Sequence, residues 1–172
     1  MLDESEAPGF RIRPIAPRDD AAMARIARAA LRAHGLDIPG TAYFDPELDH
    51  LSTYYAADER SRAYFVAVDR RDTVLGGAGF SAFPPFERCA EVQKLYVDDA
   101  ARHQGIGTAL MDAVEAAARE RGFRRLYLET HSNLEAALRL YRRLGFELIE
   151  RPSFVQHSTM DCFFVKDIAE NE

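Results

Sequence analysis

The segment from residue 92 to residue 121 constrains the fold more than any other, because it joins a strand-like run directly to a long amphipathic helix. Val92–Val97 has the composition of a strand, and Gly105 and Gly107 then open a helix predicted to end near Arg121. The two glycines allow a sharp turn with outward-facing N–H groups. Because the first N–H groups of a helix lack internal partners and that end is positive, the junction predicts a pyrophosphate site.

The helix has an apolar stripe at helical spacing, and strand-like residues follow it at Leu126–Leu128. A strand, a helix and a second strand form a unit whose two strands should be parallel. The same periodicity predicts the other elements. Further strands are expected at Phe10–Ile15, Tyr64–Val68, Thr73–Phe80, Cys89–Val97, Phe146–Ile149 and Met160–Val165, and further helices at Asp20–Ala33, Asp45–Ala57 and Leu134–Leu144.

Two irregularities interrupt the predicted strands. The alternation of the fourth strand fails at Gln93-Lys94 and again at Leu95–Val97, which indicates a bulge. Three glycines, Gly76, Gly77 and Gly79, lie in the strand before it, which indicates a bulge or the close approach of another backbone or a ligand.

Length, charge and cysteine content exclude several classes of protein. The 172 residues suit one domain, predicted over residues 10–167 between short tails at 1–9 and 168–172. The net charge of −6 argues against nucleic-acid binding, and the chain lacks an apolar run of the ~18 residues that span a membrane. Two cysteines make no disulfide framework and no metal-ligand pair is present. We therefore expect a cytoplasmic protein without a structural metal.

Two sequence motifs resemble those of a known family. Arg102-x-x-Gly105-x-Gly107 resembles the coenzyme A signature (Gln/Arg)-x-x-Gly-x-(Gly/Ala) of the GNAT N-acetyltransferase superfamily. About 40 residues later, Leu140-Tyr141-Arg142-Arg143-Leu144-Gly145-Phe146 resembles that family's Leu-Tyr-x-x-Leu-Gly-Phe, and the element order also matches from Phe10 to Val165. A lone Gly-x-Gly could serve only a tight strand-to-helix connection. The two motifs together favour the family.

The resemblance implies an α/β (α+β) GNAT-like fold: a central, mixed, mostly antiparallel sheet of about seven strands, with helices on both faces and a splayed parallel pair formed by the fourth and fifth strands. It also implies acetyl-coenzyme A as a cosubstrate, with no metal. Backbone groups of Leu95, Tyr96 and Val97 would contact the pantetheine arm. The turn that would hold the pyrophosphate comprises Arg102, His103, Gln104, Gly105, Ile106, Gly107 and Thr108.

Amide formation requires two proton movements, since the substrate ammonium loses a proton and the departing thiolate gains one. Glu91 resembles the general base of histone-acetylating family members, and its pKa should be raised if it faces the cleft. The alternative is a solvated glutamate, with bound water as the base. Tyr141 is the candidate acid, because the family's tyrosine at this place lies near the coenzyme sulfur. The alternative is a core aromatic residue.

The resemblance is incomplete near the start of the last helix. The family often has asparagine seven residues before the tyrosine, but that position is Leu134 here, and Asn133 lies one residue earlier. Asn133 either reaches the coenzyme or is a first-turn residue of a Ser132–Glu135 capping box. His131 either steers the substrate or is structural, and Cys89 is predicted to be a small buried residue.

The acceptor is predicted only by class. Residues 37–59 contain six acidic residues, four aromatic residues and no lysine or arginine, which would suit a cationic amine or describe an ordinary solvated helix. We expect an N-acetyltransferase that acts by direct attack of a primary amine of a small molecule or peptide, and a homodimer is left open. The alternative is a non-catalytic acyl-coenzyme A-binding regulatory module. A nucleotide-binding module is disfavoured, because the lysine-containing phosphate loop is missing.

Overall fold

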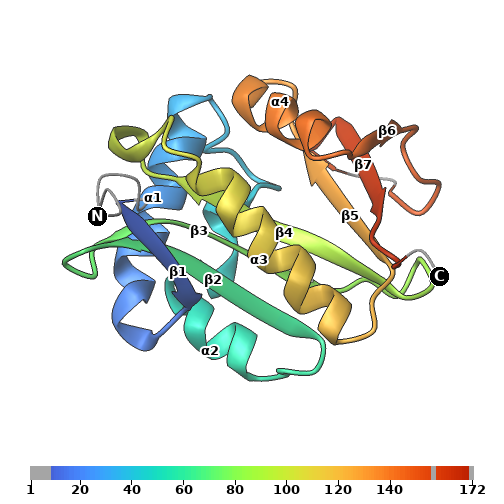
Figure 1. Ribbon diagram of the computed structural model, residues 1–172. Coiled ribbons are helices and arrows are strands. Elements are labelled where there is room, and N and C mark those ends of the chain that lie inside the picture. Colours follow the sequence, from blue (N-terminus) through green and yellow to red (C-terminus); the bar gives the residue numbers. More distant parts are fainter. Residues whose placement is uncertain (1–8, 156–157, 171–172) are drawn as a thin grey trace, which may run out of the picture.

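The computed structural model describes residues 9–155 and 158–170, which form a seven-stranded sheet in the order β1-β2-β3-β4-β5-β7-β6 (Figure 1). Neighbouring strands are antiparallel except for the parallel pair β4 and β5. This confirms the predicted mixed, mostly antiparallel sheet. The strands are β1 (Phe10–Pro14), β2 (Arg62–Asp69), β3 (Val74–Ala82), β4 (Cys89–Val97), β5 (Arg125–Thr130), β6 (Glu147–Ile149) and β7 (Cys162–Asp167).

Helices cover both faces of the sheet, as predicted. Helices α1 (Asp20–Ala33) and α2 (Leu51–Ala56) pack with β2 around one buried apolar cluster. Helices α3 (Ile106–Glu120) and α4 (Glu135–Arg143) cover the opposite face, where a larger cluster forms the main core, and α3 runs diagonally across the sheet (Figure 1). Periodicity predicted these helices because each carries an apolar stripe that must be buried.

The strands β4 and β5 pair over three residues only. The ladder joins Cys89–Glu91 to Arg125–Tyr127, and beyond it the two strands separate. The predicted bulge is present in β4: three residue steps from Gln93 to Tyr96 face two steps on β3, and Lys94 has a φ of +54°. The bulge and the short ladder together open a gap beside the last residues of β4.

The glycines of β3 permit close approach, one of the two roles predicted for them. A Cβ at Gly77 would lie 2.5 Å from the ring of Tyr64, and one at Gly79 would lie 2.5 Å from the carbonyl oxygen of Ala63. A Cβ at Gly76 would lie 2.7 Å from the carbonyl oxygen of Tyr96. Larger residues at these places would push β2 and β4 away from β3.

One local prediction was confirmed only in part, and another was wrong. The helical segment expected over Asp45–Ala57 begins after Asp45 as predicted, but it divides into a 3₁₀ turn at Pro46–His50 and α2, and the Asp45 carboxylate binds Lys94 and does not cap the turn. The capping box expected at Ser132–Glu135 is also absent, because the hydroxyl of Ser132 donates to Asp161 and α4 begins without a side-chain cap. In both cases the polar side chain binds a residue that is distant in the sequence and does not cap the helix that follows it.

The described part of the chain has two further properties that bear on the predictions. The packed domain reaches Ile168, which is buried and whose amide donates to the carbonyl of Arg124. Residues 1–8 of the predicted N-terminal tail and residues 171–172 lie outside the described residues. Among those described, no helix combines the length and apolar character needed to cross a membrane.

Candidate acetyltransferase site

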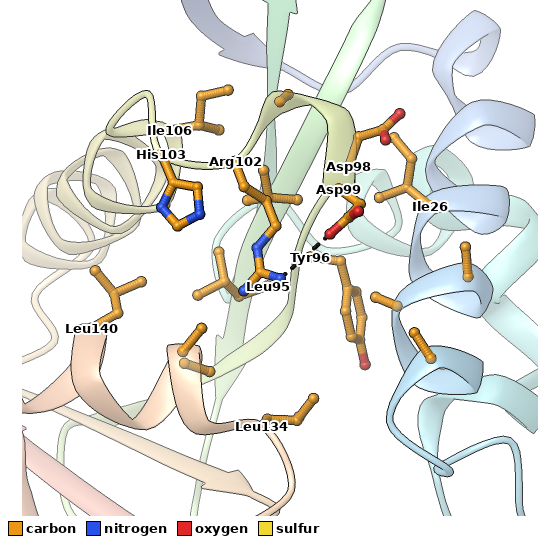
Figure 2. Close-up of a pocket in the computed structure, with 18 of the residues that line it drawn as sticks. Ile26, Leu95, Tyr96, Asp98, Asp99, Arg102, His103, Ile106, Leu134 and Leu140 are labelled. Carbon is orange, nitrogen blue, oxygen red and sulfur yellow. Dashed lines mark hydrogen bonds and ion pairs between the residues drawn. The ribbon is translucent and has the colours of Figure 1, made fainter.

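A cleft of about 460 Å³ lies beside the end of β4. Its walls come from four elements: β4 at the back, α1 on one side, and the start of α3 with one face of α4 on the other (Figure 2). Among the residues with a predicted role, nine line it. They are Leu95, Tyr96, Val97, Arg102, His103, Gly105, Ile106, Gly107 and Thr108.

The N-terminus of α3 opens into this cleft. Gly105 is the N-cap residue, its φ of +80° lies in the left-handed region that favours glycine, and no side chain caps the helix. His103 also has a positive φ, of +66°. Because no side chain occupies the helix end, the first-turn N–H groups and the positive end of the dipole are available to an anion in the cleft.

Three arginines line the cleft from three different elements. Arg25 comes from α1, Arg102 from the turn before α3, and Arg143 from α4. Arg102 is partly neutralised by Asp99, which lies 3.4 Å away and is almost fully exposed (Figure 2). Guanidinium groups together with a helix N-terminus suit a polyphosphate ligand better than either feature alone.

A second hollow, of about 260 Å³, adjoins the cleft. The two share the side chains of Leu95, Tyr96, Leu134 and Ala137. Glu91 and Tyr141, the predicted base and acid, both line the second hollow. The fold therefore brings these two residues together from β4 and α4, next to the cleft that the glycine turn borders.

Glu91 has the environment expected of a proton acceptor. Burial raises the pKa of its carboxyl group, and the charges of Glu129 and Asp45 add to the increase. The side-chain amide of Gln93 and the charge of Lys94 act in the opposite direction and lower the pKa. The net pKa is raised above the ordinary value, in the direction predicted for a glutamate that faces a cleft.

Two tyrosines line the hollow near each other. Burial raises the pKa of Tyr141, whose ring packs on Phe146 and Phe164, so its phenol stays protonated at neutral pH. Burial also raises the pKa of Tyr96, and Tyr141 adds to this effect. Sequence reasoning gave Tyr96 a backbone role only, yet its side chain borders both the cleft and the hollow.

The acidic, aromatic segment at residues 37–59 contributes to the hollow in part. Asp45 and Glu47 line it, and their carboxylates lie 2.9 and 3.3 Å from the ammonium nitrogen of Lys94. Asp49 instead pairs with Arg28 on α1. The ionic lining of the hollow remains acidic, with one lysine and four carboxylates: Asp45, Glu47, Glu91 and Glu129.

Several predicted residues lie outside both cavities. Gln104 and Asn133 line neither, and the amide of Asn133 donates to the carbonyl of His34 at the end of α1. Their contact with the coenzyme stays a prediction. His131 accepts a hydrogen bond from the backbone of Asn133, which favours its structural role. Cys89 is buried as predicted, and burial raises the pKa of its thiol to about 12.

Sequence reasoning missed the wall that α1 supplies. Ala29, Ala30 and Ala33 line the cleft together with Ile26, and their small side chains leave room between α1 and α3. Alanines three or four residues apart on one helix face were a readable signal, because such a face cannot fill the space in front of it. In the described residues, no group of three or more His, Cys, Asp or Glu side chains is arranged to hold a metal ion.

Comparison with solved structures confirms the fold. An acetyltransferase of the GNAT family from Staphylococcus aureus Mu50 superposes with a TM-score of 0.80 at 19% identity, covering 93% of this chain and 99% of that one. A GNAT superfamily phosphinothricin acetyltransferase from Sinorhizobium meliloti, solved in complex with acetyl-coenzyme A, superposes with a TM-score of 0.71 at 23% identity, covering 92% and 88%.

Comparison of sequences identifies the family as well as the fold. An uncharacterized N-acetyltransferase of Escherichia coli K12, YjgM, is 36% identical over 141 residues, which cover 81% of this chain and 83% of that protein. An L-methionine sulfoximine/L-methionine sulfone acetyltransferase of Pseudomonas aeruginosa PAO1 is 35% identical over 53% of this chain and 56% of its own length. The acetyltransferase (GNAT) family matches residues 29–146, more than half of the chain. The protein therefore belongs to the GNAT family of acetyltransferases.

Proposed function

We propose that this protein transfers an acetyl group from acetyl-coenzyme A to a primary amine of a small molecule or peptide, by direct attack of the amine on the thioester. One observation carries the proposal: the uncapped N-terminus of α3 opens into a cleft that adjoins the hollow lined by Glu91 and Tyr141. A phosphate-binding cleft beside a hollow with proton-transfer groups is what this reaction requires.

The coenzyme-binding half of the proposal rests on the cleft. The first-turn N–H groups of α3 and the guanidinium groups of Arg25, Arg102 and Arg143 would bind the phosphates. The backbone of β4 beyond Glu91 has no partner in β5, so its edge can hydrogen-bond an extended chain such as pantetheine. Several complexes of GNAT structures with this fold carry acetyl-coenzyme A or coenzyme A, which supports the same assignment.

In the chemical step, the carboxylate of Glu91 takes a proton from the acceptor ammonium. The neutral amine then attacks the thioester carbonyl, the carbon–sulfur bond breaks, and the nitrogen releases its second proton to water as the amide forms. Tyr141 donates its phenolic proton to the departing sulfur and regains one from solvent. The raised pKa values of both groups match these tasks, because a higher pKa makes the Glu91 carboxylate a stronger base and keeps the Tyr141 phenol protonated.

The proposed acceptor is a cationic amine. The ionic side chains of the hollow comprise one lysine and four carboxylates, so an ammonium group is attracted and a carboxylate is repelled. The sulfoximine and phosphinothricin acetyltransferases among the similar proteins are named for amino-acid analogues. Such acceptors carry a carboxylate as well as an amine. Comparing their turnover with that of purely cationic amines therefore tests the charge argument.

A panel of amines tests the proposal. Purified protein is mixed with acetyl-coenzyme A and each of a set of di- and polyamines, amino-acid analogues and peptides, and release of free thiol is followed. We expect turnover with cationic amines, a loss of about 10²–10³-fold in kcat/KM for Glu91→Gln, and little change for Glu120→Gln, an exposed acid at the end of α3. Tight coenzyme binding with no turnover across the panel would contradict the enzyme and favour an acyl-coenzyme A-binding regulatory module.

A further inference from the structure

A chain of two hydrogen bonds connects Glu91 to a buried tyrosine on another element. The side-chain nitrogen Nε2 of Gln93 donates to Oε1 of Glu91 at 2.9 Å. The amide oxygen of Gln93 in turn accepts a hydrogen bond of 2.7 Å from the hydroxyl of Tyr55 on α2. Both ends of the amide are therefore engaged, one by the proposed base and the other by a phenol.

Tyr55 is a fixed anchor for this amide. Its side chain is 3% exposed, and its ring lies between those of Tyr54 and Tyr64, with centroids 5.0 and 5.1 Å away. Burial raises the pKa of Tyr55 well above its ordinary value, so the hydroxyl keeps its proton at neutral pH. A donor at this place selects the amide orientation in which the oxygen of Gln93 faces Tyr55 and the nitrogen faces Glu91.

We infer that Gln93 is a positioning residue for the proposed base: its amide, oriented by Tyr55, holds the Glu91 carboxylate in the second hollow, which we call the acceptor hollow, and lowers the pH above which that carboxylate can accept a proton. The inference rests on the proposed function, since it concerns the same base. The rotated amide would place its oxygen against a carboxylate oxygen, an arrangement of two acceptors that is unfavourable while Glu91 is ionised.

Gln93 acts among several other groups around Glu91. Its hydrogen bond stabilises the ionised carboxylate and so opposes burial, which favours the neutral acid. Removing the amide should therefore raise the pKa of Glu91, whereas removing a neighbouring acid should lower it. The titratable and charged groups around Glu91 are Glu129 and Tyr127 on β5, Lys94, Tyr96 and Cys89 on β4, Tyr55 on α2, Asp45 and Glu47 before α2, Tyr141 on α4, and Arg151 after β6.

The test is the pH dependence of kcat/KM in matched variants. Gln93→Met keeps the length of the side chain but cannot donate, and it should move the acid limb of the profile to higher pH by ~1 unit. Tyr55→Phe removes one oxygen atom, leaves the amide unanchored, and should move the limb in the same direction by a smaller amount. Glu129→Gln removes a neighbouring negative charge and should move the limb to lower pH.

Two controls separate this inference from the proposed function. Coenzyme A affinity should be nearly unchanged in Tyr55→Phe, and its thermal unfolding should stay cooperative and lie well above the assay temperature, so that a shifted limb is not a folding defect. In Glu91→Gln the limb should disappear. If the limb persists there, Glu91 is not the base and the proposed function fails in that detail. If the limb disappears in Glu91→Gln but stays unmoved in both Gln93→Met and Tyr55→Phe, Glu91 remains the base and the positioning role is overturned.

Discussion

The hydroxyl of Tyr64 donates a 2.7 Å hydrogen bond to the main-chain carbonyl of Lys94, the residue with positive φ in the β4 bulge. Tyr64 lies on β2, two strands from β4, and its ring reaches across β3 at Gly77 and Gly79, where a Cβ would lie 2.5 Å from it. The bulge of β4 is thus held by a side chain from a strand two positions away in the sheet.

Tyr64→Phe should loosen this bulge. The Lys94 carbonyl would lose its phenol partner, and we expect the free energy of unfolding to fall by ~1–2 kcal/mol in urea titrations. Coenzyme A affinity should fall several-fold as well, because the last residues of β4 border the cleft. A loss of stability with unchanged coenzyme affinity would show that Tyr64 supports the core alone.

Two substitutions at Gly107 separate the effect of added bulk from the effect of added charge at the proposed phosphate site. A Cβ there would lie 3.0 Å from Cδ2 of Leu140, the mobile end of a side chain, so Gly107→Ala should bind coenzyme A within a few-fold of the original. Gly107→Asp adds a negative charge in the first turn of α3 and should weaken binding by at least ~100-fold in calorimetric titration. Equal affinities for the two variants would refute the phosphate site.

Tyr141 and Tyr96 form a matched pair for identifying the acid. Both line the acceptor hollow, and burial raises the pKa of both, but only Tyr141 belongs to the Leu-Tyr-x-x-Leu-Gly-Phe motif. Tyr141→Phe should lower kcat by ~10²-fold while the dissociation constant of coenzyme A stays the same. Tyr96→Phe should have a clearly smaller effect on kcat. The reverse ranking in steady-state kinetics would assign proton donation to Tyr96.

Ionisation of Glu91 should also make the free energy of unfolding depend on pH. Its pKa is raised on folding, so the folded state holds the proton more tightly, and stability is lost as pH rises from the unfolded pKa of about 4.3 through the folded value. Above that window, Glu91→Gln should be more stable than the original protein, and at about pH 4 the difference should vanish. Urea unfolding at both pH values measures this, and Glu120→Gln should show no such pH-dependent gain.

The sequence by itself determined most of the elements and the position of the glycine turn that borders the cleft. Apolar periodicity placed α1, α3 and α4, and β4 was predicted with the bounds it has, because each of these segments must bury one apolar face. The turn from Arg102 to Thr108 was readable because its positive-φ glycine and its helix start are consecutive in the chain. Local geometry of this kind needs no knowledge of distant residues.

Only the tertiary structure showed which residues surround Glu91 in the second hollow. Glu91, Gln93 and Tyr55 are connected by hydrogen bonds between β4 and α2, and 38 positions separate the tyrosine from the glutamine. The carboxylate of Asp45 binds Lys94 on β4, and Ser132 binds Asp161 where the sequence indicated a local capping box. A polar side chain takes whichever partner the fold brings within reach, and for these residues that partner lies on another element, so no local pattern in the sequence could reveal it.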